Sequence, residues 1–161
     1  MKKQVNYKID KTDEKILTLL LDNARMPFLK IAKRCNLSGA AIHQRVKSLE
    51  NRGVIQGYYT KLDTAILGLD ITAFVSIRFE KKKDYKNVIE ELSKIPEIVE
   101  AHFSTGEYDL IIKVVCKNKE DLRKLIIETL NTKIESIEST CTYISLGQIF
   151  NRPITIGESK D

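Results

Sequence analysis

The first third of the chain repeats hydrophobic residues at the spacing of amphipathic helices. Three apolar faces result, formed by Ile16, Leu17, Leu20 and Leu21, by Phe28, Ile31, Ala32 and Cys35, and by Ile42, Val46 and Leu49. Residues three, four and seven positions apart share one side of a helix, so each stretch buries one side. Pro27 and Ser38 suit helix starts, and Asn36 and Gly53 suit helix ends. The pattern predicts three short helices, over residues 10–25, 27–36 and 38–53.

The hydrophobic period changes after Gly53. Residues 54–63, "VIQGYYTKLD", are rich in β-branched and aromatic residues, and we expect a strand or a short β-wing there. Strands are then expected over 71–79, 98–104, 109–115 and 137–146, and helices over 84–95 and 119–130. A β-α-β unit that occurs twice predicts a ferredoxin-like fold, an antiparallel sheet with two helices on one face. The fold class is therefore α+β.

The first predicted strand of the sheet has two different faces. Alternate residues place Ala73, Val75, Ile77 and Phe79 on one side and Thr72, Phe74, Ser76 and Arg78 on the other. The helices cover only one face of such a sheet, and the mixed second face suits a partner subunit. We therefore expect at least a dimer.

Charge divides the chain at the same place as the hydrophobic pattern. Residues 1–60 carry 12 Lys and Arg against 5 Asp and Glu, whereas residues 61–161 carry 15 against 17. A basic segment joined to a slightly acidic one is typical of a DNA-binding part attached to a part with another role. The chain has no apolar run of the ~20 residues that cross a bilayer and no signal-peptide core. Its three cysteines lack metal-ligand spacing, so we expect a cytoplasmic protein.

The second and third predicted helices, joined by "CNLS", have the lengths of a helix-turn-helix. The buried positions of the third helix leave Ala40, His43, Gln44 and Lys47 on its open face, with Arg45 toward one edge. Imidazole, amide and cationic groups are the kinds that read base edges and bind phosphates. This face is therefore the candidate DNA-binding surface.

The third helix opens with Ser38, Gly39 and Ala40, which have almost no side chain. A recognition helix enters the major groove with its N-terminal end first, so small residues would let the backbone approach the bases and phosphates. Alternatively, the same residues pack closely against the preceding helix. Both interpretations can hold, and the sequence leaves open which residue faces DNA.

Three stretches carry a family resemblance: "IDKTDEKILTLLLDNAR", "IAKRCNLSGAAIHQRVKSLENRGVIQGY" and "LGLDITAFVSI". From about Asp10 to Gln148 the chain resembles the Lrp/AsnC family, the leucine-responsive and asparagine-responsive regulators of bacteria and archaea. With the patterns above, the resemblance implies a winged helix-turn-helix over 1–60, a linker over 61–69 and a C-terminal ferredoxin-like βαββαβ (RAM) domain over 70–161. It also implies homodimers that assemble into octamers or other oligomers, and regulation by amino acids.

The family's sensor signature, Gly-x-x-Asp between the two middle strands, is matched by Gly106 to Asp109 in "STGEYDLII". Gly106 permits a tight or positive-φ turn, and Tyr108 and Asp109 can supply an aromatic wall and a carboxylate for an α-amino group. A plain hairpin turn is the simpler interpretation of these residues alone, whereas the resemblance implies an effector site. The expected effector-binding residues are Gly106, Glu107, Tyr108, Asp109, Thr140 and Thr142.

These patterns predict a sequence-specific DNA-binding transcription regulator, not an enzyme, whose partners are double-stranded DNA, an amino acid and further copies of itself. The expected DNA contacts are Ser38, Gly39, Ala40, His43, Gln44, Arg45 and Lys47. His43 and His102 lack partners at metal-site or triad spacing, so no metal and no cofactor besides the amino-acid effector is expected. One alternative is an amino-acid-sensing or metabolite-binding ferredoxin-like protein that does not act on DNA. Another is a winged helix that docks protein.

Overall fold

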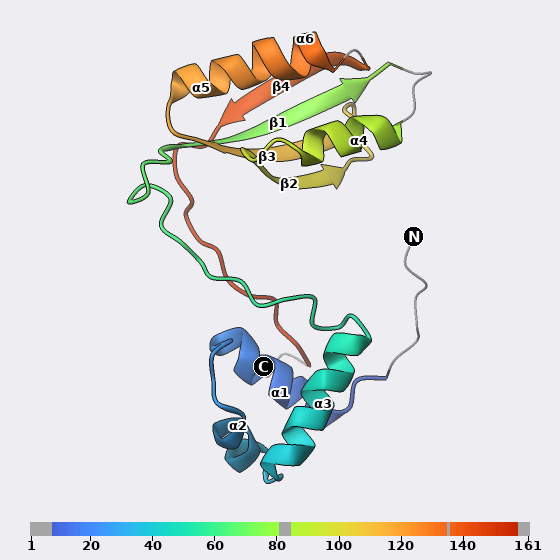
Figure 1. Cartoon of the computed structure of the whole chain (residues 1–161), viewed down its shortest axis with the longest axis vertical. Coiled ribbons are helices and arrows are strands. Elements are labelled where there is room, and N and C mark those ends of the chain that lie inside the picture. The colour runs from blue at the N-terminus through green and yellow to red at the C-terminus, as the bar shows by residue number, and fades with distance from the viewer. Residues whose placement is uncertain (1–7, 81–84, 135, 158–161) are drawn as a thin grey trace. The chain divides into compact units, whose positions relative to one another are not determined.

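The computed structural model describes residues 8–80, 85–134 and 136–157. Its contacts divide the chain into two compact units (Figure 1). Of the described residues, the helical unit contains 8–61 and 150–157, and the sheet unit contains those between 62 and 149. The domain bounds expected from the sequence stay a prediction, although the contacts group residues 150–157 with the helices.

The helical unit contains α1 (Lys11–Asp22), α2 (Phe28–Cys35) and α3 (Gly39–Asn51), as the hydrophobic spacing predicts. Asp10 caps α1 in a capping box with Asp13, and Asn36 ends α2 in the left-handed conformation, with φ of 55°. The three apolar faces meet in one core, formed by Ile16, Leu20, Met26, Ile31, Ala32, Ile42 and Val46. Each large side chain buried there contributes about 1.5–3 kcal/mol relative to an exposed position.

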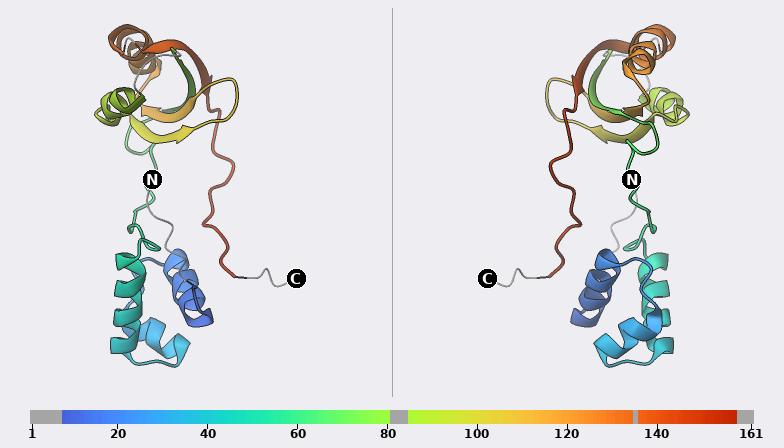
Figure 2. Two further views of the ribbon diagram at one scale, coloured as in Figure 1. Left: turned by 90° about the vertical axis from the view of Figure 1, so that its right-hand side faces the viewer. Right: turned by 90° about the vertical axis from the view of Figure 1, so that its left-hand side faces the viewer.

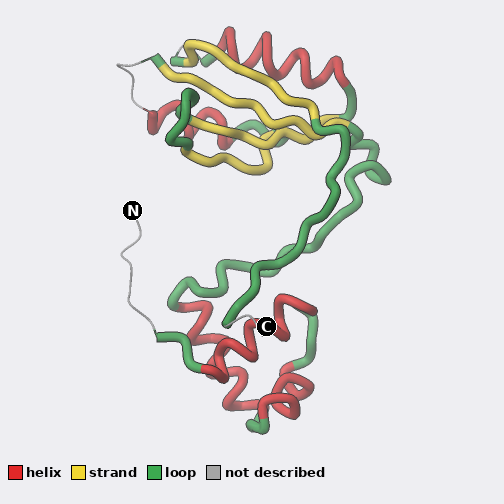
Figure 3. Tube along the Cα trace, turned by 180° about the vertical axis from the view of Figure 1, so that it is seen from behind, coloured by secondary structure: helices red, strands yellow, loops and turns green. Residues whose placement is uncertain are grey.

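The segment after α3 does not form the predicted wing strand. Within the described part of the chain, residues 52–70 carry turns and irregular backbone and take part in no sheet (Figure 3). The Val54 and Ile55 N–H groups instead donate to the Leu49 carbonyl, at 2.9 and 3.2 Å. A strand needs a partner for its backbone groups, and β-branched composition alone does not provide one.

The C-terminal segment 150–157 covers part of α1. Ile154 and Ile156 line an apolar hollow of about 470 Å³ together with Leu17 and Leu20 of α1 and with Tyr58. At the end of the described segment, a Cβ placed on Gly157 would lie 3.4 Å from a carboxylate oxygen of Glu14. These contacts are the physical reason why the segment belongs to the helical unit.

The sheet unit contains strands β1 (Ile71–Phe79), β2 (Ile98–Phe103), β3 (Leu110–Cys116) and β4 (Ile137–Ile144). All neighbouring strands are antiparallel, in the order β2-β3-β1-β4. This order is the predicted ferredoxin-like arrangement. Because β1 pairs with β3 at the centre of the sheet, the loop between β2 and β3 lies beside the end of β1, at one end of the strands.

All helices of the sheet unit cover the same face (Figure 2). They are α4 (Tyr85–Ser93) and a second helical stretch that the sequence predicted as one helix. This stretch consists of α5 (Lys119–Lys124), the π-helix η1 (Leu125–Leu130) and α6 (Asn131–Lys133). Under them, Val75, Ile77, Ile112, Val114 and Leu130 are completely buried.

None of the described helices lies on the opposite face of the sheet (Figure 2). Phe74 and Tyr143 lie there side by side in the β1–β4 ladder, and they are 42% and 60% exposed. Ile111 of β3 shares this face through its pairing with Ser76 and is 37% exposed. The mixed apolar and polar face predicted from β1 is therefore present.

Candidate DNA-binding surface and ligand-sensing loop

The N-terminus of α3 is small and exposed. Ser38 is the N-cap, and its hydroxyl oxygen accepts a hydrogen bond from the Ala41 N–H at 3.1 Å. The first turn contains no acidic residue, so the positive end of the helix dipole is not neutralised from within the helix. Ser38 and Ala40 are exposed. This end of the helix is suited to approach a phosphate.

Gly39 faces the preceding helix, which bears on the two interpretations of the small residues. A Cβ at Gly39 would lie 3.1 Å from the Leu29 Cδ2 atom of α2, a tighter contact than side chains normally make. The packing interpretation therefore applies to Gly39. The DNA-approach interpretation stays a prediction for the exposed Ser38 and Ala40.

The outer face of α3 carries the predicted hydrogen-bonding groups. His43, Gln44 and Lys47 are exposed, one turn or more beyond Ala40. The His43 ring packs edge-on against Phe28, with 5.8 Å between ring centroids. This contact orients the imidazole ring on α3, and the ring stays exposed.

Arg45 does not lie on this outer face. Its Nη1 atom is 2.7 Å from a carboxylate oxygen of Asp10 and 2.7 Å from one of Asp13. The Asp13 side chain is only 2% exposed, so Arg45 neutralises a buried charge at the start of α1. These hydrogen bonds to Asp10 and Asp13 raise the pKa of the guanidinium. Arg45 therefore connects α3 to α1, and its expected contact with DNA stays a prediction.

Three further exposed cations lie on α2, next to α3. They are Lys30, Lys33 and Arg34. The DNA contacts predicted from the sequence lie on α3 alone, although the buried stripe of α2 indicates that these residues face outward. Cations on the first helix of a helix-turn-helix can bind the DNA backbone without reading sequence.

The predicted sensor loop between β2 and β3 meets Arg78 of β1. The Arg78 guanidinium forms an ion pair with Glu107 and lies over the Tyr108 ring, 5.1 Å from its centroid. It also donates to the Glu107 backbone carbonyl at 3.3 Å. Arg78 is one third exposed and the Glu107 side chain is 73% exposed. Arg78 is not among the effector-binding residues expected from the sequence.

Asp109 supports the loop from within. Its Oδ2 atom accepts a hydrogen bond from the Phe79 N–H at 2.8 Å, and its own N–H donates to the Ile77 carbonyl at 3.0 Å. Asp109 thus holds the loop to the end of β1. Gly106 takes part through its N–H, which donates to the Ser104 hydroxyl at 3.2 Å.

The positive-φ alternative for Gly106 was wrong, because this residue is absent from the positive-φ glycines of the described chain. A Cβ on Gly106 would have only one near neighbour, the Ser104 hydroxyl at 3.6 Å. Small size at this position leaves space beside the loop.

The structure does not bring Thr140 and Thr142 together with Tyr108. They are in register with Ile77 and Val75, whose side chains lie under the helices, and the Thr140 hydroxyl donates to Asn131. The other face of β4 carries Cys141 and Tyr143. The correction follows from the two-residue period of a strand.

Cys141 and Tyr143 are the β4 residues that lie close to Tyr108. Desolvation and the neighbouring Cys141 raise the pKa of the Tyr108 hydroxyl. A hydrogen bond with Cys141 is the main cause that raises the pKa of Tyr143. The sensor patch is therefore defined as Arg78, Glu107, Tyr108, Cys141 and Tyr143.

The described residues contain no group of three or more His, Cys, Asp and Glu side chains arranged to hold a metal ion. His102 is 71% exposed, and its Nε2 atom is 3.7 Å from Glu100. Among the described helices, none is long and apolar enough to cross a membrane.

Comparisons with known proteins match both units. The family model for winged helix-turn-helix DNA-binding matches residues 9–56, and the model for the Lrp/AsnC ligand binding domain matches residues 72–155. A DNA-binding unit followed by a ligand-binding domain defines a ligand-responsive transcription regulator.

The regulatory protein AsnC of Escherichia coli is 35% identical over 149 residues, which are 92% of this chain and 97% of that protein. The solved structure of E. coli AsnC has a TM-score of 0.84 at 34% identity and covers 92% of this chain and 99% of that chain. A transcriptional regulator from Neisseria meningitidis, solved in complex with L-Met, has a TM-score of 0.84 at 25% identity and covers 90% and 94%. The chain belongs to the Lrp/AsnC family.

Proposed function

We propose that this regulator binds double-stranded DNA through the outer face of α3. The observation that carries the proposal is the exposed row of Ala40, His43, Gln44 and Lys47 beyond a small helix N-terminus. Gln44 and His43 are suited to base edges, and Lys47 to phosphate. The α2 cations would add phosphate contacts. Arg45 holds the helix in place and is not part of the contact surface.

We propose further that the sensor patch binds a free α-amino acid. Such a ligand carries an ammonium and a carboxylate, and the patch offers an exposed carboxylate on Glu107 and a guanidinium on Arg78. The two side chains satisfy each other in the structure, so a ligand with both charges can replace both halves of the pair. Tyr108 would cover the ligand's side chain, and Asp109 would hold the loop. The relative solved with L-Met supports the ligand class.

The open face of the sheet is the proposed contact between two copies. It presents Phe74, Ile111 and Tyr143 in exposed positions on a surface that no described helix covers. A dimer formed there would place two α3 helices on one DNA site, and larger assemblies would follow from contacts between dimers.

Fluorescence anisotropy with DNA from upstream of the chain's own gene tests the DNA proposal. Specific binding should exceed binding to random DNA, and log affinity should fall linearly with log salt concentration. Equal affinity for both DNAs at every salt concentration would reject sequence-specific binding and favour a sensor that does not act on DNA.

A melting-temperature screen of the twenty amino acids tests the ligand proposal. A ligand that binds the folded state raises the melting temperature by mass action. A rise with at least one amino acid is expected, and no rise with any of them would reject this ligand class.

A further inference from the structure

The His43 side chain has little to pack against on its own helix. Helical side chains lean over the residues three and four positions earlier, which for His43 are Ala40 and Gly39. One of these residues offers a methyl group and the other only a hydrogen. The exposed imidazole would therefore be free to adopt several orientations if α3 alone surrounded it.

A contact from α2 supplies the missing support. The ring centroids of Phe28 and His43 lie 5.8 Å apart, and the ring planes are inclined by 69°, which is an edge-on arrangement. Aromatic pairs of this geometry favour contact over separation by roughly two- to twelvefold. The Phe28 ring therefore restricts the orientations of an imidazole that stays exposed on the outer face of α3.

Phe28 is itself held in place by the fold. It is half-buried and packs against the core of the helical unit. It begins α2 directly after Pro27, whose carbonyl accepts hydrogen bonds from the Lys30 N–H at 2.8 Å and the Ile31 N–H at 3.2 Å. A ring fixed by the core and by the first helical turn can position an exposed neighbour.

A hollow of about 330 Å³ lies beside these two rings and is also lined by Val46, Lys47 and Glu50. It gives an incoming group access to the imidazole. The Glu50 carboxylate accepts a hydrogen bond from the Tyr58 hydroxyl at 2.9 Å. Its charge offsets that of Lys47, so the hollow has little net attraction for a phosphate. The uncharged edge of a base carries hydrogen-bonding groups that an imidazole can pair with.

We propose that Phe28 is a positioning residue for sequence recognition. It orients His43 so that the imidazole meets a base edge in the major groove, and it does so without touching DNA. An imidazole held in one orientation cannot turn to suit a different base, so a mismatch leaves its hydrogen bond unmade. The inference rests on the proposed DNA contact of α3 and adds a residue of α2 to the determinants of sequence preference.

Phe28→Leu tests this role in the full chain. Leucine keeps an apolar side chain on the core but removes the ring that contacts His43. Selection of binding sites from randomised DNA gives the base preference at each position, and His43 reads the position where His43→Ala relaxes this preference. Phe28→Leu should reduce the preference there about two- to tenfold, with an unchanged salt slope. Phe28→Tyr keeps the ring and should retain the wild-type preference.

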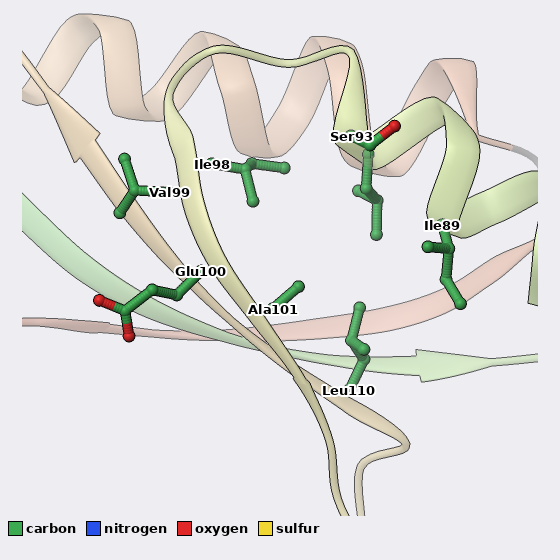
Figure 4. Close-up of a pocket in the computed structure, with 8 residues that line it drawn as sticks. Ile89, Ser93, Ile98, Val99, Glu100, Ala101 and Leu110 are labelled. Atoms are coloured by element: carbon green, nitrogen blue, oxygen red, sulfur yellow. The ribbon is translucent and has the colours of Figure 1, made fainter. Parts of the chain in front are cut away.

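Ile98→Val is the matched control for a general loss of packing. Ile98 is also half-buried and packs against the core of its own unit, where it lines a hollow of about 280 Å³ between α4 and β2 (Figure 4). The substitution should leave the base preference unchanged at every position. Circular dichroism checks that Ile98→Val and Phe28→Leu remain folded. Equal shifts of preference in these two variants would overturn the proposal, because the effect would then follow from packing in general.

A double substitution separates positioning from direct contact. In the His43→Ala background, Phe28→Leu should have no further effect on preference, because the side chain that it positions is absent. Additive effects would overturn the proposal by making Phe28 a DNA contact in its own right. A preference that depends on His43 but not on Phe28 would overturn it and leave the α3 proposal intact. Binding that none of His43→Ala, Gln44→Ala and Lys47→Ala alters would overturn both.

Discussion

Arg45 at the edge of α3 and Arg78 beside the sensor loop both pair with carboxylates, but the two pairs differ in burial. Arg45 neutralises the buried Asp13, whereas Arg78 pairs with the exposed Glu107. A buried acid that loses its partner costs much more than an exposed one, because water cannot replace the partner. The first pair therefore serves the fold, whereas the second, in the proposed ligand site, would lose little stability on exchanging its partner for a ligand.

The largest expected effect is the complete loss of the amino-acid response in Arg78→Ala. The variant lacks the group for the ligand carboxylate, but its ligand-free melting temperature should stay close to that of wild type, because the pair is exposed. Melting curves with and without the amino acid found in the screen measure both quantities. An undiminished response would place the ligand elsewhere.

Next in size is the effect of Arg45→Ala on stability. The variant removes the Arg45 guanidinium from the buried Asp13 carboxylate, so the free energy of unfolding should fall by about 2 kcal/mol. Urea unfolding followed by circular dichroism measures this change. The salt dependence of DNA binding should keep its slope. A stable variant with a reduced slope would instead make Arg45 a phosphate contact.

Lys47→Ala is the matched comparison on the same helix. It should leave the unfolding free energy within about 0.5 kcal/mol of wild type, as at other exposed positions. Because two copies bind one DNA site, the substitution removes two phosphate contacts. The salt slope should therefore fall by about 1.8, at about 0.9 for each lost contact. Gln44→Ala should change sequence preference more than slope. Binding titrations over a salt series on two operator variants separate the two effects, and an unchanged slope for Lys47→Ala would remove it from the surface.

Two substitutions at Asp109 distinguish support of the loop from direct contact with the ligand. Asp109→Ala removes the acceptor for the Phe79 N–H and should lower the unfolding free energy by about 1 kcal/mol. Asp109→Asn retains an acceptor oxygen and should keep both the stability and the amino-acid response. If Asp109→Asn is stable but unresponsive, its charge acts on the ligand directly.

The smallest expected effect is the acid sensitivity that Arg45 confers through Asp10. A hydrogen bond from the Asp13 N–H and, next in size, one from Arg45 lower the pKa of Asp10 in the folded state. This contribution to stability is complete above the unfolded pKa of about 4 and is lost as pH falls through the lower folded value. Wild type should therefore lose more stability than Arg45→Ala on acidification from about pH 4. Parallel losses in unfolding titrations would count against this linkage.

The helical unit shows what the sequence could and could not predict. Apolar spacing located α1, α2 and α3, because helical period depends only on neighbours along the chain. The spacing placed Arg45 at the edge of the open face of α3. It could not show the carboxylate partners of Arg45, which lie more than thirty residues earlier in the chain. The role of Arg45 depends on how α1 and α3 pack.

For the sheet, the sequence located the strands and the loop but not the face on which each β4 residue lies. Thr140 and Thr142 were chosen for the sensor site, whereas the ladder turns Cys141 and Tyr143 toward it. β4 pairs with a neighbour on one side only and carries mixed residues on both faces. Its sequence therefore does not show which set of alternate residues faces the helices. The missing wing strand has a related cause, since strand formation depends on a partner that composition does not reveal.

The helical unit is discontinuous in sequence, and this has a consequence for synthesis. Its three helices leave the ribosome first, but residues 150–157, which line the hollow on α1, follow the whole sheet unit. Domains generally fold in order of synthesis. The nascent helices therefore expose apolar surface until the last described residues emerge, so a chain interrupted before residue 150 carries every predicted DNA contact without the covering of α1.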